Sequence, residues 1–497
     1  MGQTQRCGEP CHLGRKRFCI VRAGAYEPPA GSIPTLSVPS LEGIRSVHLI
    51  GAGGAGMRNL AKLLVSRGMR VSGSDLKDSK GLAELTSLGA RMDVGHDAAR
   101  LGSPDAVVIS SAIPDGNVEL EEARARGIPV WARAQALAAL GQGKKSIAVA
   151  GTHGKTSTTS MIGVVLEHAG LDPTYLVGGD LNESGSGARG GGGDLFVFET
   201  DESDGSFLLS RPFIGVVTNV DVDHIDFYPG GRGEIEAAFA AFIGGCRNVV
   251  ACGDDPGARR SLMLAGVEAI TYGTGHANAV RVEISSEGPG GARGKLTMDG
   301  APPLRLDLRV DGAHNLLNAA AAVATARSLG VAPAKAADAL ASFSGVHRRF
   351  EHRGQVRGVD FYDDYGHVPL ELAVTLQVAR RLGPKRLIAL FQPHRYSRTQ
   401  ALWRELGESL VEADLILITD VYGADQEPIP GVTGKLVVDG VRRAAPDKPV
   451  VYLPHRGEAI AYLEQHVTEG DMVVTMGCGD IWMLGEAAMA RMKARDA

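Results

Sequence analysis

Residues 146–168 read SIAVAGTHGKTSTTSMIGVVLEH, and they contain the clearest local signal in the chain. The apolar run at 146–150 predicts a short buried strand, and the segment 157–168 has the pattern of a helix. The residues GTHGKT join the two and form a P-loop that is two residues shorter than the G-x-x-x-x-G-K-T pattern. This strand, loop and helix predict an α/β unit whose loop holds phosphate groups.

The residue types of this loop indicate ATP and magnesium as its ligands. Backbone N–H groups would hold the phosphates, the Lys155 ammonium would meet the β- and γ-phosphate charge, and the Thr156 hydroxyl would bind Mg²⁺. The plain alternative is a glycine turn that binds nothing, and the completeness of the pattern argues against it. The predicted ATP-binding residues of the loop are Gly151, Thr152, His153, Gly154, Lys155, Thr156 and Ser157.

Carboxylates follow the next predicted strand, residues 195–199. Because the apolar run LFVF leads straight into Glu199, an exposed acidic surface does not explain this carboxylate, and we expect it to bind metal. Asp201, Glu202 and Asp204 stay open between metal ligands and ordinary loop residues.

His224 follows another predicted strand, residues 214–219, and lies in an acid-rich loop. A lone histidine is usually structural. Its place at the end of a strand beside carboxylates favours a metal ligand instead.

A second glycine-rich loop, GAGGAG at residues 51–56, follows a predicted strand at 47–50 and precedes a helix-like segment at 57–67. It fits G-x-G-x-x-G, and Asp75 ends the next predicted strand, where a ribose-binding carboxylate belongs. Taken alone, the loop is typical of an NAD-dependent dehydrogenase. A UDP-sugar also presents a diphosphate and a ribose, so the loop does not distinguish the two ligands. A turn without any ligand is the third interpretation.

The chain has 497 residues, which is too long for one core, and its alternating strand and helix signals predict three α/β domains in series. Short strand-like runs at residues 279–310 predict a small β insertion in the second domain. The expected limits are 1–42 for a disordered leader, 43–143 for the first domain, 144–346 for the second and 347–497 for the third.

Composition argues against two classes of protein. The net charge of −5 does not indicate nucleic-acid binding. The chain contains no run of 18 apolar residues that would predict a transmembrane helix, and its first 40 residues lack the apolar segment of a secretory signal. We therefore expect a cytoplasmic protein with no nucleic-acid partner and no membrane insertion. We also expect it to act on small molecules, as a monomer or homodimer, although composition does not determine which.

These motifs occur in an order that resembles the Mur ligases. The motifs that carry the resemblance are GTHGKT (151–156), ETDESD (199–204), NVDVDHID (219–226), DGAHNLLN (311–318), HRRFE (347–351), DDYGH (363–367) and FQPHRYSRT (391–399). The N-terminal GAGGAGM, with SGSD at 72–75 and SSAI at 110–113, looks like the UDP-binding domain of the branch that adds L-alanine. The resemblance runs from about residue 43 to the end of the chain.

The resemblance implies an ATP-dependent ligase with a Rossmann-like UDP-sugar domain, a central P-loop ATPase-type domain and a C-terminal Rossmann-like domain that binds an amino acid. In the implied reaction, the lactyl carboxylate of UDP-N-acetylmuramate attacks the γ-phosphate of ATP and gives an acyl phosphate and ADP. The amine of L-alanine then displaces phosphate and gives UDP-N-acetylmuramoyl-L-alanine, a peptidoglycan precursor. The implied cofactors are ATP and two Mg²⁺ ions.

The resemblance also implies the site residues by their positions in the motifs. The implied catalytic residues are Lys155, Glu199, His224, Arg349 and His367. The implied metal ligands are Thr156, Glu199 and His224, and the implied ATP contacts beyond the P-loop are His314, Asn318 and Arg349. The implied UDP-sugar residues are Gly51, Gly53, Gly54, Ala55, Gly56, Met57, Asp75, Ser110 and Ser111. The implied amino-acid residues are Tyr365, His367, His394, Arg395 and Arg398.

Plain interpretations of several of these residues remain open. Without the resemblance, His314 is a helix cap, Asn318 is a packing residue, Arg349 is a surface arginine, and the basic run at 394–398 faces solvent. Arginine side chains nevertheless suit the carboxylate of an amino acid, because a guanidinium binds it through two parallel hydrogen bonds.

The chain departs from the family pattern near both expected substrate sites. Val368 and Leu370 stand where the family usually has His and Thr, and Arg58 and Asn59 stand where small residues are usual. The amino-acid donor is therefore less firmly implied than the reaction.

Three alternatives to the alanine-adding branch follow. The first is a murein tripeptide-recycling ligase, and the second is a divergent paralogue, which either uses another amino-acid donor or binds nucleotides without ligation. The third is a dinucleotide-dependent oxidoreductase, which leaves the P-loop unexplained. No lysine occurs between Lys155 and Lys295, so the chain cannot bridge its metals with a carbamylated lysine as sibling ligases do. This agrees with the alanine-adding branch.

Overall fold

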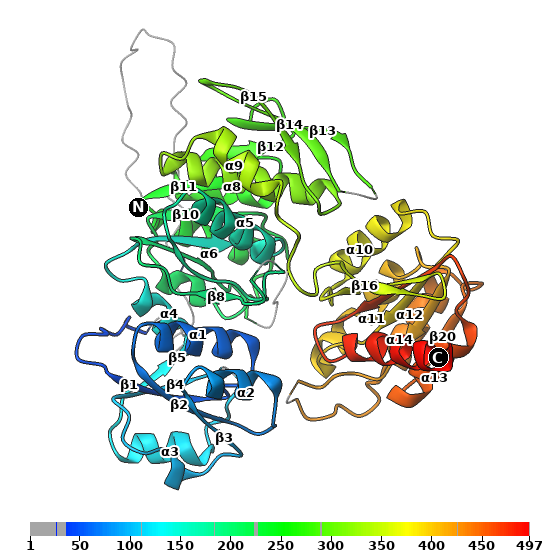
Figure 1. Cartoon of the computed structure of the whole chain (residues 1–497), viewed down its shortest axis with the longest axis horizontal. Helices are drawn as coiled ribbons and strands as arrows, with labels where there is room; N and C mark the ends of the chain where they lie inside the picture. The colour runs from blue at the N-terminus through cyan, green and yellow to red at the C-terminus, as the bar shows by residue number, and fades with distance from the viewer. Residues whose placement is uncertain are drawn as a thin grey trace, which may run out of the picture.

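The structure is a computed structural model that describes three sheet-containing lobes in series (Figure 1). The described residues are Tyr26 and 36–496, apart from Ser111, Glu183, 223–226, 289–290 and Asp425. The expectations for His224, for Ser111 and for nearly all of the leader therefore concern residues outside the described set. In Figure 1 the first lobe is blue to cyan, the second mainly green, and the third yellow to red.

The first lobe contains a five-stranded parallel sheet in the order β3-β2-β1-β4-β5. Its strands are β1 (Ser46–Ile50), β2 (Arg70–Asp75), β3 (Arg91–Val94), β4 (Ala106–Ile109) and β5 (Val130–Ala132). Its helices are α1 (Ala55–Ser66), α2 (Lys80–Ser87), α3 (Val118–Ala125) and α4 (Arg133–Leu140), with the 3-10 turn η2 (Ala98–Arg100). The central strand β1 is buried along its whole length, as expected for a parallel sheet covered by helices.

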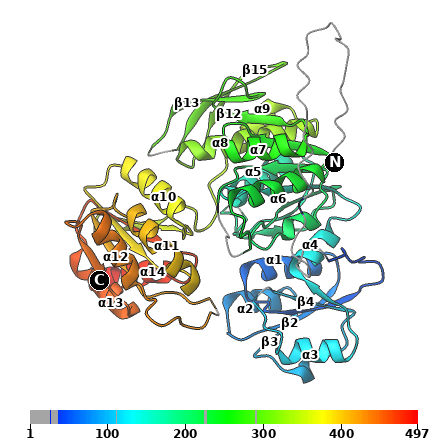
Figure 2. The ribbon, with the colours of Figure 1, turned by 180° about the vertical axis from the view of Figure 1, so that it is seen from behind.

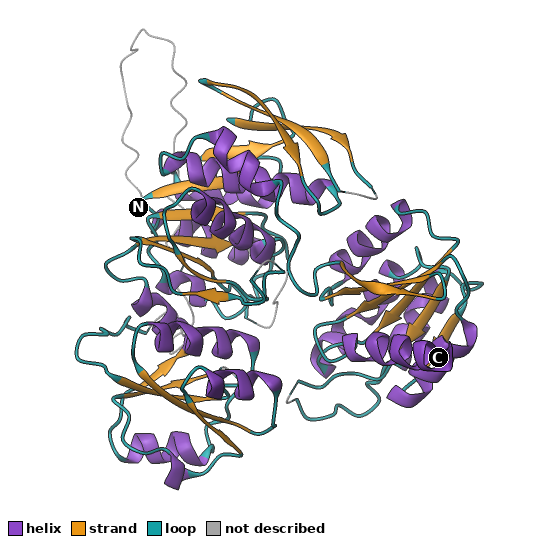
Figure 3. Ribbon diagram, viewed as in Figure 1, coloured by secondary structure: helices purple, strands orange, loops and turns teal. Residues whose placement is uncertain are grey.

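The second lobe contains a ten-stranded sheet in the order β15-β14-β13-β12-β11-β10-β6-β9-β7-β8. Its strands are β6 (Lys145–Ala150), β7 (Thr174–Leu176), β8 (Ala188–Arg189), β9 (Leu195–Glu199), β10 (Ile214–Val217), β11 (Asn248–Cys252), β12 (Ile270–Gly273), β13 (Val280–Ser286), β14 (Arg293–Met298) and β15 (Ala301–Asp307). Its helices are α5 (Lys155–His168), α6 (Arg232–Gly244), α7 (Pro256–Ala265), α8 (Ala313–Ser328) and α9 (Pro333–Leu340), with the 3-10 turn η3 (Ser206–Leu209). Figure 3 shows helices on both faces of its parallel part.

The predicted β insertion is present as an extension of this sheet. β13 pairs parallel with β12, and β14 and β15 then add in antiparallel register. Buried and more exposed residues alternate along β14, because one face of the hairpins packs on the lobe and the other faces solvent. The three strands therefore enlarge the central sheet and form no separate unit.

The third lobe contains a six-stranded sheet in the order β16-β17-β21-β18-β19-β20. Its strands are β16 (Glu351–Val356), β17 (Val359–Asp364), β18 (Arg386–Phe391), β19 (Leu415–Ile418), β20 (Val450–Tyr452) and β21 (Asp471–Met476). Its helices are α10 (Pro369–Arg381), α11 (Tyr396–Ser409), α12 (Lys435–Ala444), α13 (Arg456–His466) and α14 (Trp482–Asp496). β16 is antiparallel to β17, whereas the other neighbours are parallel.

Strand order places the expected site residues together. β6 lies between β9 and β10, so the P-loop after β6 stands beside Glu199 at the end of β9 and Thr218 after β10. Figures 1 and 2 both place α10 on the side of the third lobe that faces the second. Within the described part of the chain, no helix is long and apolar enough to cross a membrane. The three-domain α/β architecture predicted from the sequence is confirmed, while the residue limits of the domains remain a prediction.

Candidate active site

The P-loop is held in shape by the residues that follow β10. Gly151 has a φ of +138°, and a Cβ added to it would lie 2.0 Å from Oγ1 of Thr218. Asn219 Oδ1 accepts a hydrogen bond from the His153 N–H at 2.8 Å, and Asn219 Nδ2 donates to the His153 carbonyl at 2.9 Å. Gly154 then has a φ of +81° where α5 begins. The loop needs glycine at both positions because backbone and side chains approach it closely.

Lys155 begins α5 and lies inside the loop. Its ammonium donates to the two carboxylate oxygens of Glu202 at 2.8 and 2.9 Å and to the Gly151 carbonyl at 2.6 Å. Burial would lower the pKa of Lys155, but the negative charges of Glu202 and Asp201 outweigh it and raise the pKa. A charged ammonium is therefore kept ready where phosphate oxygens would lie. Glu202, whose role the sequence left open, is the counter-ion of this lysine.

Thr156 and Glu199 form a pair of oxygen ligands beside the loop. The Thr156 hydroxyl donates to Glu199 Oε2 at 2.8 Å. Gly178 makes room for the carboxylate, because a Cβ at that position would lie 1.8 Å from Glu199 Oε1. Hydroxyl and carboxylate oxygens are ligands that Mg²⁺ prefers. The pair therefore fits a magnesium ion that binds together with nucleotide phosphates.

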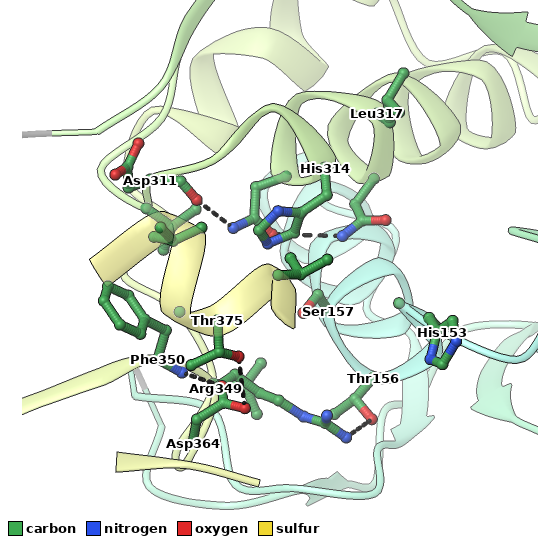
Figure 4. A pocket seen from close by; sticks show the side chains of 18 of the residues that line it. His153, Thr156, Ser157, Asp311, His314, Leu317, Arg349, Phe350, Asp364 and Thr375 are labelled. Atoms are coloured by element: carbon green, nitrogen blue, oxygen red, sulfur yellow. Dashed lines mark hydrogen bonds between the residues drawn. The ribbon is translucent and has the colours of Figure 1, made fainter. Parts of the chain in front are cut away.

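Arg349 reaches this pair from the linker between the second and third lobes. Its Nη2 donates to the Thr156 hydroxyl oxygen at 3.3 Å, and its guanidinium lies 5.1 Å from the centre of the Tyr365 ring. Figure 4 shows the side chain extended toward Thr156. Beside it, Asp364 accepts hydrogen bonds from the Phe350 N–H and the Thr375 hydroxyl at 2.8 and 3.0 Å. The hydrogen bonds of Asp364 fix the segment next to Arg349, and the Arg349 guanidinium is thereby held against the P-loop.

A cavity of about 1030 Å³ lies between the second and third lobes. The predicted ATP residues that line it are His153, Gly154, Thr156, Ser157, His314, Asn318 and Arg349. The Asn318 side-chain oxygen accepts a hydrogen bond from the Thr158 hydroxyl at 3.1 Å. Burial lowers the pKa of His314, so its imidazole is neutral at neutral pH. Size, glycines and charge make the cavity suitable for a nucleoside triphosphate.

The predicted amino-acid residues meet in the third lobe. The ring of His367 lies 5.7 Å from those of Tyr365 and His394, and Arg398 Nη1 lies 3.4 Å from His394 Nδ1. The backbone N–H of Arg395 donates to the Tyr422 carbonyl at 2.8 Å. The residues are therefore assembled as a cluster of neutral rings and guanidinium groups.

Burial controls the charge of this cluster. Burial, with the charges of Arg398 and Arg349 in addition, lowers the pKa of His367 to about 4. Burial together with nearby His367 and Arg398 lowers the pKa of His394 to about 3. Both imidazoles are therefore neutral at neutral pH, and the arginines carry the positive charge that would attract a carboxylate.

The first glycine-rich loop is closed by Asp75. The Gly53 N–H donates to Asp75 Oδ2 at 2.9 Å, and the side chain of Ser110 lies beside Gly51. Met57 is buried in the core of this lobe, where it packs α1. The loop and its carboxylate are in the arrangement that the sequence predicted, although Met57 faces the core.

Two residues that depart from the family pattern connect the first and second lobes. Arg58 Nη2 donates to Asp180 Oδ2 at 2.8 Å, and Asn59 Nδ2 donates to the Val177 carbonyl at 3.0 Å. Both positions stand out in the sequence as departures from the family pattern, but no local pattern indicates their partners, which lie more than a hundred residues away. Glu371, the last residue of the segment DDYGHVPLE at 363–371, is a further residue of the site, and the sequence had assigned it no role. It lies between His153 and His367 and lines the cavity.

Three models of Mur ligase domains match the chain. The catalytic domain matches residues 46–145, the middle domain residues 149–326 and the glutamate ligase domain residues 348–479. These matches span most of the chain. The chain belongs to the Mur ligase family. Mur ligases are ATP-dependent enzymes, in agreement with the P-loop and its lysine.

Relatives of this Mur ligase carry a common name. It is 46% identical to the UDP-N-acetylmuramate–L-alanine ligase of Thermobifida fusca, over 88% of this chain and 95% of that protein. It is 42% identical to the ligase of the same name from Nitratidesulfovibrio vulgaris, over 90% of this chain and 99% of that protein.

Solved structures of similar shape come from two branches of the family. The crystal structure of the UDP-N-acetylmuramate–alanine ligase MurC of Thermotoga maritima has a TM-score of 0.77 at 29% identity and covers 90% of this chain and 99% of its own. The murein peptide ligase Mpl of Psychrobacter arcticus has a TM-score of 0.71 at 25% identity with the same coverage. Both matches agree with the three-lobed α/β architecture of the chain.

Proposed function

We propose that this Mur ligase joins the amine of L-alanine to the lactyl carboxylate of UDP-N-acetylmuramate, with conversion of ATP to ADP and phosphate. The observation that carries the proposal is the 3.3 Å contact between Arg349, at the start of the third lobe, and Thr156 of the P-loop. This contact supports a single site in which the phosphate loop faces the amine-binding cluster. The names of relatives at 42–46% identity agree with this substrate pair.

In the first step, a carboxylate oxygen of the UDP-sugar attacks the γ-phosphorus of ATP. The bond to the β,γ-bridging oxygen breaks, and its electron pair leaves with ADP. When ATP binds, the Lys155 ammonium would leave Glu202 and contact the phosphate oxygens. Arg349 would add a second positive charge from the third lobe. Once the nucleotide is bound, both positive charges would be in place before phosphoryl transfer, so they would stabilise the transferring group without rearrangement of solvent.

Thr156 and Glu199 are the described residues that we propose as magnesium ligands, and His224 would complete the set from outside the described part. Mg²⁺ supplies Lewis-acid stabilisation of the phosphate oxygens. Among the described residues, no cluster of three or more His, Cys, Asp or Glu side chains could hold a metal alone. Magnesium is usually held by one or two carboxylates together with substrate phosphates, so two protein oxygens suffice here. We propose two ions, as in the family pattern.

In the second step, the amine nitrogen of L-alanine attacks the acyl carbon. The bond from that carbon to the phosphate oxygen breaks, and inorganic phosphate leaves with its electron pair and with the proton that the nitrogen loses as the amide forms. The amino acid arrives as an ammonium ion and must first lose a proton. We propose that neutral His367 accepts it. His367 Nδ1 lies 3.1 Å from the Tyr365 carbonyl, which leaves Nε2 as the acceptor. Arg395 and Arg398 would hold the alanine carboxylate.

The first lobe would bind the UDP part of the acceptor. Backbone N–H groups of the loop at 51–56 suit a diphosphate, and Asp75 is placed for a ribose hydroxyl. We propose that the functional domains are 43–143, 144–346 and 347–497, and that the enzyme works as a monomer or homodimer.

The test is phosphate release by the purified chain with Mg-ATP, UDP-N-acetylmuramate and one amine at a time. We expect release with L-alanine, and none when either the UDP-sugar or the amine is omitted. Glycine, L-serine and the muramyl tripeptide serve as competing donors. Leu370 lines the cavity and is 48% exposed, so the wall near the amine differs from the family pattern. Release with the tripeptide alone would contradict the proposal and indicate the recycling reaction.

A further inference from the structure

Glu371, a carboxylate that the proposed reaction does not use, connects the two halves of the site. It is the third residue of α10, and its Oε1 lies 3.4 Å from Nδ1 of His153 in the P-loop. Its Oε2 accepts a hydrogen bond from the backbone N–H of His367 at 3.0 Å. The same oxygen lies 3.6 Å from the ring nitrogen Nδ1 of His367. One side chain therefore contacts both the nucleotide loop and the amine cluster.

The start of α10 explains why a carboxylate is stable there. Val368 occupies the N-cap position without a side-chain hydrogen bond, and Pro369 follows it. The positive end of the helix dipole then favours a negative charge in the first turn. Burial would raise the pKa of Glu371, but the hydrogen bond with His153 and the charges around it, including Arg349, outweigh burial and hold the pKa well below its usual range. Glu371 is therefore ionised throughout the working pH range.

We infer that Glu371 is a positioning residue that orients the His367 imidazole for proton transfer and ties this orientation to the P-loop through His153. The inference rests on the proposed function. The Tyr365 carbonyl and the Glu371 carboxylate both face His367 Nδ1, so they keep the proton on that nitrogen and leave Nε2 free to accept another. The contact with His153 makes the geometry depend on the approach of the third lobe to the second.

The charges around His367 determine what removal of Glu371 would do. The groups that face this imidazole are Glu371 of α10, Arg349 of the linker, Arg398 of α11, His394 after β18 and Tyr365 after β17. Burial and the two guanidinium groups lower the pKa of His367, whereas the Glu371 carboxylate raises it. Loss of that carboxylate therefore makes His367 a weaker base and moves its titration to lower pH.

The test compares Glu371→Gln with the wild type, with each substrate varied in turn. Glutamine keeps an oxygen that can accept a hydrogen bond from the backbone N–H of His367, but it removes the negative charge of the carboxylate. We expect kcat/KM for L-alanine to fall about tenfold or more, because an outer partner of a reacting imidazole has an effect of that order. We expect KM for UDP-N-acetylmuramate to change by less than about twofold, since that substrate lies in the first lobe.

The pH profile separates this role from a structural one. In the wild type, kcat/KM for L-alanine should fall on the acid side as His367 gains a proton, and Glu371→Gln should move this limb to lower pH while lowering the plateau. Glu412→Gln is the matched control, because Glu412 is an exposed carboxylate of the same lobe whose partner is Arg380. It should match the wild type in both respects.

His153→Asn and the double variant measure the connection to the P-loop. We expect His153→Asn to lower kcat/KM for L-alanine several-fold in the wild-type background and to have no further effect on it in Glu371→Gln. Equal losses with all three substrates, or an acid limb that does not move, would overturn the inference. A wild type without turnover would overturn the proposed function itself, whereas an active wild type whose variant keeps its alanine profile would overturn only the role of Glu371.

Discussion

The two glycine-rich loops of this chain have the same local architecture and opposite charge. Each follows the central part of a parallel sheet and opens with a glycine of positive φ, +82° for Gly51 and +138° for Gly151. In the first loop, the carboxylate of Asp75 accepts from the Gly53 N–H. In the second, the ammonium of Lys155 lies against the Gly151 carbonyl.

We interpret this difference as a division of roles, in which the backbone N–H groups of each loop would bind phosphate and side chains from the neighbouring strands would determine the chemistry. Beside the first loop lies the carboxylate of Asp75, which we propose for a ribose hydroxyl, whereas beside the second lies the pair of Thr156 and Glu199, which we propose for magnesium. We therefore expect changes in the first loop to affect KM for the UDP-sugar, and changes in the second to affect kcat.

The largest expected effect is at Lys155, where the loops differ most. Lys155→Ala should lower kcat about a thousandfold or more, because it removes a fixed positive charge from the transferring phosphoryl group. The measurement is phosphate release with saturating substrates. Lys145→Ala, at the exposed start of β6, is the control and should keep wild-type activity. A loss of less than tenfold at Lys155 would show that the second loop only binds nucleotide.

The next effect is on stability. Gly151→Ala should lower the free energy of unfolding by about 2–4 kcal/mol, because the new methyl group would lie 2.0 Å from Thr218 Oγ1 in a backbone with positive φ. Denaturant unfolding followed by circular dichroism measures it. A variant as stable as the wild type would mean that the loop is looser than its hydrogen bonds indicate.

Asp75→Asn tests the proposed role of the first loop in binding the UDP-sugar. We expect KM for UDP-N-acetylmuramate to rise about tenfold, because a ribose hydroxyl loses a charged acceptor worth about 1.4 kcal/mol more than an amide. KM for ATP and kcat should stay within about twofold. If kcat fell and KM did not, the first loop would take part in the chemical step and the contrast would fail.

The smallest effect is expected at Gly54. It has a φ of −66°, and a Cβ there would meet nothing closer than the Gly51 carbonyl at 4.0 Å, so Gly54→Ala should change stability by less than about 0.5 kcal/mol. Gly154→Ala is the matched variant at the second loop. Its φ of +81° and its 3.0 Å approach to Asn318 Oδ1 predict a loss of about 1–2 kcal/mol. Equal melting temperatures would contradict this contrast.

Local patterns predicted the parts of the molecule that local sequence determines. The strand before each loop, the loop glycines, Lys155 and Glu199 are recognisable because strand, turn and helix signals follow one another within about twenty residues. β16 was missed, since its sequence EHRGQV is polar and its antiparallel edge position leaves much of it exposed. Apolar alternation does not mark such a strand.

The connections between lobes were beyond local patterns. Glu371 and His153 are 218 residues apart, and no local pattern in either segment indicates that the two side chains meet. Glu202 was noticed as an acid, but its pairing with Lys155 depends on how β9 lies beside β6. Contacts of this kind depend on the packing of whole domains, which a single sequence specifies only through the complete fold.

Arg349 lies between two residues in left-handed conformation, Arg348 at φ +62° and Phe350 at φ +46°. The Arg348 guanidinium is bound to Asp363, and the Phe350 N–H is bound to Asp364, so this segment is fastened to the third lobe. Arg349 therefore travels with that lobe, and a turn of the lobe away from the P-loop withdraws its guanidinium from Thr156. If Arg349 and the third lobe have the proposed roles, the nucleotide would stay intact until that lobe approaches, because the guanidinium would reach the phosphates together with the amino-acid site.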